Sequence, residues 1–233
     1  HVLTHSFPTR RSSDLRYYFA NQCARRDRWA EEVSQHLVMN RNSGAYFHSQ
    51  HFKDIGDKGQ INYRNISLPG PNESYAEASL LAECSRHASF RSPSFVFSYR
   101  LAEGEDFQGV YKNYFTGLQE RQQKIALACK AHAGYVVRYT DIKKFYPNID
   151  SRRANDAWLK ACEAAQMPAL FRDLGLKLLD NHNQACQTHK HGKGLLTGPM
   201  FSHLIANLVL RDVDEALSDA FPGRYFRYVD DVV

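Results

Sequence analysis

The pattern of apolar and polar positions predicts a chain of helices mixed with short strands. Apolar residues that recur three and four positions apart are typical of amphipathic helices, and short aromatic and β-branched runs are typical of strands. The expected helices cover residues 16–38, 74–88, 116–133, 151–165, 170–181 and 199–220. The expected strands cover residues 61–66, 94–101, 135–142 and 224–229. Because strands and helices do not alternate strictly, the pattern favours the α+β class.

Signals at the ends of elements sharpen these boundaries. Ser74 and Glu77 form a capping box before an apolar run, which predicts the start of a helix. Pro199 opens the last helix, because proline is favoured in a first helical turn. One face of that helix is expected to be buried, with Phe201, Leu204, Ile205, Leu208 and Val209. Residues 45–73, apart from one short strand, and residues 184–198 have the composition of loops.

The composition is that of a folded protein with a weak basic bias. The chain has 233 residues, of which 43% are hydrophobic and 24% charged, so it can bury a core. The net charge of +5 is compatible with a nucleic-acid partner without identifying one. The five cysteines form no CxxC pair, which argues against structural zinc and disulfides and favours the reducing cytoplasm. No apolar run approaches the roughly 20 residues of a membrane span.

The amino-terminal residues differ from the rest of the chain. There is no initiator methionine, and residues 5–15 resemble the translation of a common sequencing adapter. We therefore expect residues 1–15 to be a non-native tail, which is excluded from reasoning about the fold. The alternative is an ordinary basic, serine-rich tail.

Acidic residues at strand ends are the first candidates for chemistry. Asp230 and Asp231 lie between two aromatic and β-branched runs, which predicts a strand, a tight turn and a returning strand. Asp141 ends another expected strand. Taken alone, Asp141 at a strand end is typical of a cap or turn residue. Taken alone, the Asp230–Asp231 pair is typical of a solvated turn. If these strands pair, three carboxylates meet at one sheet edge and form a site for two Mg²⁺ ions, with Mn²⁺ as the alternative, suited to phosphoryl transfer.

Three segments resemble the conserved motifs of reverse transcriptases, in the same order and at similar spacing. Residues 139–149 resemble motif A, residues 194–208 resemble motif B, and Tyr-Val-Asp-Asp at 228–231 resembles motif C. The resemblance implies a right-hand polymerase fold, fingers plus partial palm, with an antiparallel sheet and packed helices. It further implies that residues 16–93 are an N-terminal helical and loop region that begins the fingers. Residues 94–233 would be fingers and palm, truncated after motif C, without a thumb and inactive alone.

The resemblance also implies roles for individual residues at the metal site. Asp141 and Asp230 would bind both catalytic ions, Asp231 would be a more peripheral third acid, and the carbonyl of Ile142 would complete the metal shell.

The implied substrate-binding residues are Lys144, Phe145, Tyr146, Thr197, Gly198 and Arg100. The amides of Lys144 and Phe145 would approach the triphosphate. Tyr146 would be a steric gate that excludes a 2′-hydroxyl, or else an ordinary core aromatic. Gly198 would permit close approach of the backbone to the template base and nucleotide. Arg100 would contact phosphate with two donors, or else lie on the surface.

The implied function is RNA-directed DNA polymerisation, in which dNTPs are added to a 3′-hydroxyl or a protein hydroxyl with release of pyrophosphate. The partners would be an RNA template, a DNA or RNA primer, dNTP and a dedicated non-coding RNA. Thr197, in place of glutamine, and Val229, in place of alanine, are more similar to the bacterial abortive-infection and defence-associated group. The alternatives are an RNA-dependent RNA polymerase, against which Tyr146 argues, and a non-catalytic RNA-binding module, against which the three acids argue.

Overall fold

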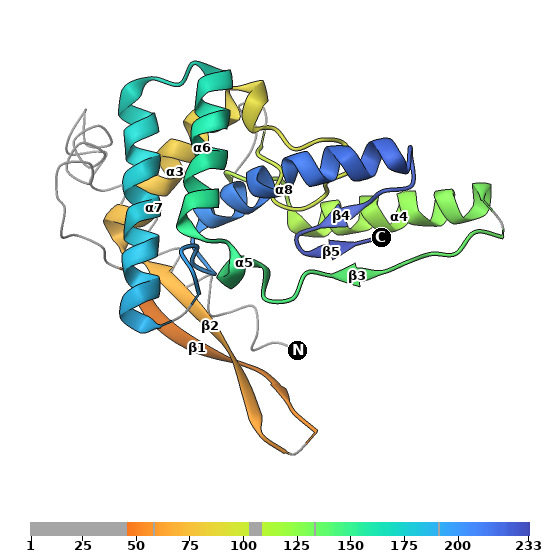
Figure 1. The fold of residues 1–233 in the computed structure, drawn as a ribbon, viewed down its shortest axis with the longest axis horizontal. Helices are drawn as coiled ribbons and strands as arrows, with labels where there is room; N and C mark the ends of the chain where they lie inside the picture. Colours follow the sequence, from red (N-terminus) through yellow and green to blue (C-terminus); the bar gives the residue numbers. More distant parts are fainter. Residues whose placement is uncertain (1–45, 58, 103–108, 133, 191) are drawn as a thin grey trace.

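The computed structural model describes residues 46–57, 59–102, 109–132, 134–190 and 192–233, and these form an α+β fold (Figure 1). The strands are β1 (Tyr46–Ile55), β2 (Ile61–Pro69), β3 (Thr140–Asp141), β4 (Arg227–Tyr228) and β5 (Asp231–Val232). The helices are α3 (Pro71–Ser85), α4 (Tyr114–Ala131), α5 (Phe145–Asn148), α6 (Ser151–Ala165), α7 (Ala169–His189) and α8 (Met200–Ala220), with a 3₁₀ turn η1 at Ala88–Phe90. The expected helix at 16–38 and the tail at 1–15 lie outside the described residues.

The hydrophobic core lies where α3, α6, α7 and α8 pack together. Its centre is aromatic: the rings of Phe90 and Trp158 are 5.4 Å apart, and those of Trp158 and Phe201 are 5.2 Å apart. A Cβ at Gly175 would lie 2.3 Å from the Trp158 ring, so glycine lets α7 approach α6 closely. This helical body supports both of the β-structures that project from it.

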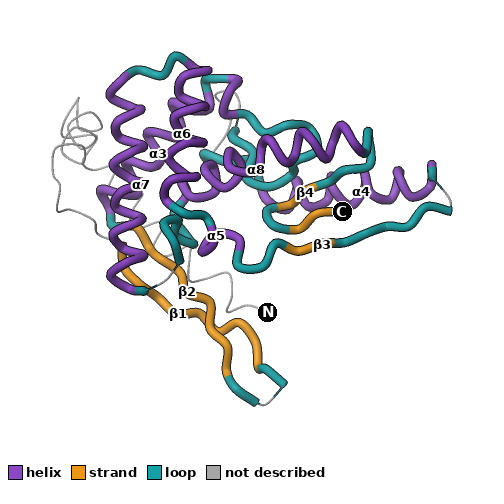
Figure 2. The backbone as a smooth tube through the Cα atoms, in the orientation of Figure 1, coloured by secondary structure: helices purple, strands orange, loops and turns teal. Residues whose placement is uncertain are grey.

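The strands form one long hairpin and one short sheet (Figure 2). The hairpin pairs β1 with β2 antiparallel. In the short sheet β5 lies between β3 and β4 and is antiparallel to both, beside α4 and α8. The segment before Ser98 runs along the outer side of β4, where Phe97 N donates to Arg227 O and Arg227 N donates to Phe95 O. None of the helices within the described ranges is long and apolar enough to cross a membrane.

Three helices match their expected ranges closely. The predictions for 116–133, 151–165 and 199–220 are confirmed by α4, α6 and α8. The expected apolar face of α8 is also confirmed, because Phe201, Leu204, Ile205 and Leu208 are buried and Val209 packs against the same core. Asp150 caps α6 by accepting from Arg153 N at 2.9 Å, a typical start for a helix.

The loops expected over residues 45–73 and 184–198 are in part wrong. The first contains the β1–β2 hairpin, which is largely exposed and therefore lacks the apolar alternation of a half-buried strand. Its turn is closed by Gly56 N, which donates to Gln60 O at 2.8 Å. In the second, α7 continues to His189, because Cys186 packs against Tyr46 and Leu196.

The capping box expected at Ser74 and Glu77 is wrong. The helix α3 begins at Pro71, with Gly70 as its N-cap and no side-chain cap. The Glu77 carboxylate is buried and accepts hydrogen bonds from Tyr46 Oη at 2.8 Å and from Phe201 N at 3.2 Å. This carboxylate therefore joins α3 to β1 and α8 instead of closing a helix end.

Three expected strands are shorter than predicted, and of residues 224–229 only Arg227 and Tyr228 form β4. Residues 94–101 form only isolated bridges, at Val96 and Leu101. Of residues 135–142, only Thr140 and Asp141 pair, because β5 offers them two partners. Val136 is 94% exposed, so the apolar run before β3 is not covered by the described residues.

Candidate metal and nucleotide site

Three carboxylates meet at one edge of the β3–β5–β4 sheet. Asp141 ends β3, Asp230 lies in the turn between β4 and β5, and Asp231 begins β5. One oxygen from each lies within 4.8 Å of the others. The pairing of Asp141 with Asp231, together with a 3.1 Å hydrogen bond from Ile142 N to Asp230 O, sets this arrangement. The expectation that these carboxylates share one sheet edge is confirmed.

The electrostatics of Asp230 show a site rich in negative charge. Burial raises the pKa of Asp230, a backbone hydrogen bond lowers it, and the charges of Asp141 and Asp231 raise it further. The guanidinium of Arg64 lowers it by a smaller amount. Like carboxylates held this close favour the bound proton, and a divalent cation would relieve the same repulsion. Three hard oxygen donors are also the ligands that Mg²⁺ prefers, so the donor set fits this ion.

The turn that carries Asp230 is strained. Val229 has φ = 57°, a left-handed conformation that is unusual for a β-branched residue. Two hydrogen bonds hold it there: Val229 N donates to Ser98 Oγ at 2.7 Å, and Arg227 Nη1 donates to Val229 O at 2.9 Å. The surrounding side chains therefore fix a backbone conformation that valine disfavours by itself.

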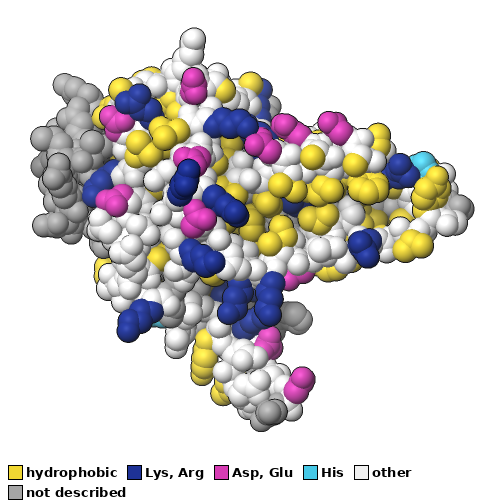
Figure 3. Space-filling view, viewed as in Figure 1, with side chains coloured by type: hydrophobic (Ala, Val, Ile, Leu, Met, Phe, Trp, Pro, Cys, Tyr) yellow, Lys and Arg dark blue, Asp and Glu magenta, His cyan; other side chains and the backbone are white. Residues whose placement is uncertain are grey.

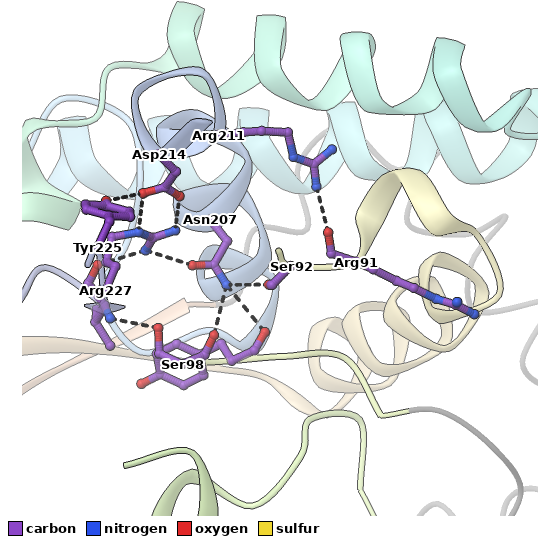
Figure 4. Close-up of polar contacts among 10 residues, drawn as sticks. Arg91, Ser92, Ser98, Asn207, Arg211, Asp214, Tyr225 and Arg227 are labelled. Carbon is purple, nitrogen blue, oxygen red and sulfur yellow. Dashed lines mark hydrogen bonds and ion pairs between the residues drawn. The ribbon is translucent and has the colours of Figure 1, made fainter. Parts of the chain in front are cut away.

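A buried polar network supports this turn from below (Figure 4). Arg227 donates to Asp214 through two nitrogens, at 2.7 and 2.6 Å, and to Asn207 Oδ1 at 3.0 Å. Tyr225 Oη donates to Asp214 at 2.6 Å, and Asn207 Nδ2 donates to Ser98 O at 3.1 Å. The sequence reasoning missed this network. The sequence feature that could have revealed the network is the i, i+7 spacing of Asn207 and Asp214, which places two polar residues on the buried side of α8, where they need hydrogen-bond partners.

Tyr146, the candidate steric gate, lies at the end of the core that borders the carboxylates. Its side chain is buried, and its hydroxyl is 2.7 Å from His203 Nδ1. Burial raises the pKa of Tyr146 well above its usual value, and the charges of Tyr99 and Asp230 add to that effect. Phe145 is also buried, whereas the Lys144 side chain is exposed and its backbone is left-handed, with φ = 51°. The charge of Asp230 thus acts on Tyr146, and the core-aromatic interpretation also describes the burial of this side chain.

Thr197 and Gly198 contact the hairpin. Thr197 O accepts from Ser67 N at 2.8 Å, and Gly198 has φ = 122°. A Cβ on Gly198 would lie 2.4 Å from Ser67 O and 2.8 Å from Ile66 Cγ2. In this structure the glycine therefore permits close approach of the backbone to β2, and its approach to a template base and nucleotide stays a prediction.

Arg100 and Arg64 differ in their surroundings. The Arg100 guanidinium forms an ion pair with Glu120 at 2.7 Å and lies over the Phe97 ring, so α4 engages it. Arg64 projects from β2 and is the cation whose charge lowers the pKa of Asp230. The sequence reasoning missed Arg64 because this part of the chain was expected to be mostly loop. The sequence feature that could have identified Arg64 is that it is the one basic residue in the strand expected over 61–66.

A cavity of about 750 Å³ lies between α4, α8, residues 135–138 and the β3–β5–β4 sheet. Figure 3 shows hydrophobic side chains in a band over this part of the molecule. The exposed apolar residues that line it include Tyr135, Val136, Val137, Val213 and Phe221. None of the three carboxylates lines this cavity, but their neighbours Thr140, Ile142 and Val232 do, so the cavity adjoins the candidate metal site without containing its acidic ligands.

No protein-family model and no curated protein matches this chain. The case for function therefore depends on the chemistry of the residues themselves. The arrangement offers a carboxylate cluster for divalent cations, a cation on β2 whose charge acts on Asp230, and a buried aromatic residue on which the charge of Asp230 acts. These are parts that nucleotidyl transfer requires.

Proposed function

We propose that the chain is the catalytic part of an RNA-directed DNA polymerase, with the right-hand fold of fingers plus partial palm. The observation that carries the proposal is the meeting of Asp141, Asp230 and Asp231 at one edge of an antiparallel sheet. The resemblance of the segments around these residues to reverse transcriptase motifs supports the same assignment. In this proposal the β1–β2 hairpin belongs to the fingers and the β3–β5–β4 sheet to the palm.

The carboxylates would hold two Mg²⁺ ions, or Mn²⁺ in their place. Asp141 and Asp230 would bind both ions, Asp231 would be a more peripheral third acid, and the Ile142 carbonyl would complete the metal shell. When bound, such ions lower the pKa of the attacking hydroxyl and stabilise charge on the leaving oxygen. The chain itself supplies the geometry, since the turn at Val229 and its buried supports fix the position of Asp230.

The reaction joins a 3′-hydroxyl, or a protein hydroxyl, to the α-phosphorus of a dNTP. The new P–O bond forms as the bond to the β-phosphate oxygen breaks, so pyrophosphate leaves and the hydroxyl loses its proton. Arg64 would bind the triphosphate, because guanidinium groups suit phosphate oxygens. The amides of Lys144 and Phe145 would lie on the same side, and Tyr146 would exclude a ribose 2′-hydroxyl.

The partners of this activity would be an RNA template, a DNA or RNA primer and a dedicated non-coding RNA, in a bacterial retroelement or phage-defence system. Lys and Arg side chains gather where the hairpin joins the body (Figure 3). Arg64 on β2 is exposed, and so are Lys143 and Lys144, which directly precede α5. Cations along this surface would contribute salt-dependent binding to a nucleic-acid backbone.

Primer extension with the full-length protein tests the proposal. Wild type should incorporate dNTPs in Mg²⁺, and Asp141→Asn and Asp230→Asn should each abolish incorporation. Asp219→Asn, an exposed change on α8, is the matched control and should retain activity. Retained incorporation by both site variants would overturn the assignment. Preference for NTPs would favour an RNA polymerase, and Mg²⁺-dependent binding without incorporation would favour a non-catalytic module.

A further inference from the structure

The Tyr146 side chain is held by a histidine from another element. Tyr146 lies in α5, and its hydroxyl is 2.7 Å from Nδ1 of His203, which lies in α8. Burial lowers the pKa of His203 to about 4, so the imidazole is neutral near pH 7, with one ring nitrogen able to donate a hydrogen bond and the other able to accept one. The tautomer of the imidazole decides which of the two groups donates, and in either case the bond restrains the tip of the Tyr146 ring.

The imidazole is itself fixed by aromatic neighbours. Its ring is stacked on Tyr99 with a centroid distance of 3.6 Å and an interplanar angle of 2°. Tyr111 packs edge-on against both rings, at 5.7 Å from Tyr99 and 6.2 Å from His203, and its hydroxyl donates to Met200 O at 2.8 Å. Tyr99 has φ = 46°, a left-handed conformation that is uncommon for an aromatic residue. These contacts hold the plane of the His203 ring, and the hydrogen bond between Nδ1 and the Tyr146 hydroxyl lies at its edge.

We propose that His203 is a positioning residue that holds the Tyr146 ring and thereby sets the preference of the site for deoxyribonucleotides over ribonucleotides. This inference rests on the proposed function, since it concerns the sugar that the same site accepts. A gate excludes a 2′-hydroxyl only if its ring cannot yield to it. The hydrogen bond to His203 restrains the ring at its tip, and Phe145 packs against the ring with centroids 5.4 Å apart.

The test compares single-nucleotide incorporation of dATP and ATP by the full-length protein. We expect His203→Ala to lower the ratio of kcat/KM for dATP to that for ATP by about five- to tenfold, the effect of one net hydrogen bond. Tyr146→Phe removes the same bond and should lower the ratio equally, and the double variant should lower it no further. His203→Asn keeps an acceptor near the position of Nδ1 and should restore most of the preference.

The controls separate positioning from general damage to the fold. His87→Ala removes a histidine that interacts with Glu83 on α3 and should leave the ratio unchanged. If His203→Ala does not fold, Tyr146→Phe decides the matter, because it removes one oxygen atom and leaves the ring. Equal losses for dATP and ATP in both variants, with the ratio unchanged, would overturn the inference. A wild-type protein that incorporates neither nucleotide would overturn the proposed function, and this inference with it.

Discussion

Arg227 and Asp214 form a buried ion pair with two contacts directly beneath the turn that carries Asp230. Nε and Nη2 of the guanidinium lie 2.7 and 2.6 Å from the two carboxylate oxygens, and both side chains are 1% exposed. Arg227 belongs to β4 and Asp214 to α8, so the pair joins the β3–β5–β4 sheet to this helix. The position of the candidate metal ligands therefore depends on an interaction that touches none of them.

Replacing Arg227 with methionine should destabilise the protein by about 3–5 kcal/mol, because Asp214 would remain buried without its counter-charge. Urea denaturation measures the loss. The double change Arg227→Met with Asp214→Leu should recover much of it, since no charge then stays buried. As a control, Lys160→Ala breaks an ion pair with Asp212 whose side chains are 71% and 74% exposed, and should cost less than about 1 kcal/mol. Equal losses from the buried and exposed pairs would contradict this account.

Gly198→Ala should destabilise the protein more than Gly223→Ala does. Both glycines have positive φ, 122° and 70°, so both changes introduce backbone strain of about 1–2 kcal/mol. Only at Gly198 does the added Cβ meet backbone, 2.4 Å from Ser67 O, whereas Gly223 has nothing within 4 Å. Thermal unfolding of the two variants isolates the contact between Gly198 and β2. A larger loss at Gly223 would show that this close approach does not matter.

Arg64→Ala should raise the KM for dNTP by about tenfold or more, the effect of losing a hydrogen bond to a charged group. Arg100→Ala is the matched comparison, because Arg100 is already paired with Glu120 at 2.7 Å. We expect that variant to change stability more than KM. Steady-state primer extension with varied dNTP measures both. A rise in KM for Arg100→Ala alone would instead restore the role that the sequence assigned to it.

The sequence predicted the parts of the site that are local. Asp230 and Asp231 lie in a turn between two strands, and the buried face of α8 follows from its i, i+3, i+4 spacing. These features depend on neighbouring residues along the chain. The meeting of Asp141 with this turn was also foreseen, because the ends of paired strands lie together.

The parts that escaped prediction depend on contacts between distant segments. A strand over residues 61–66 was expected and is part of β2, but the exposed hairpin lacks apolar alternation, so neither β1 nor the effect of Arg64 on Asp230 could be inferred from periodicity. Glu77 resembles a helix cap in sequence, yet its partners are Tyr46 and the backbone of Phe201, far away along the chain. The stacking of His203 on Tyr99 has no local signal at all.

Asp230→Asn should stabilise the metal-free protein, and increasingly so as the pH rises from about 4 to about 7. Burial and the charges of Asp141 and Asp231 raise the pKa of Asp230 in the folded state, so the folded protein binds this proton more tightly than the unfolded chain. Stability of the wild type therefore falls as pH rises through that pKa, and asparagine removes the penalty. Urea denaturation in EDTA measures the difference between the two proteins, and Asp219→Asn should show no such trend. Added Mg²⁺ should close the gap by stabilising the wild type alone. A difference that is constant with pH, or that grows toward low pH, would contradict the crowding of charge at this sheet edge.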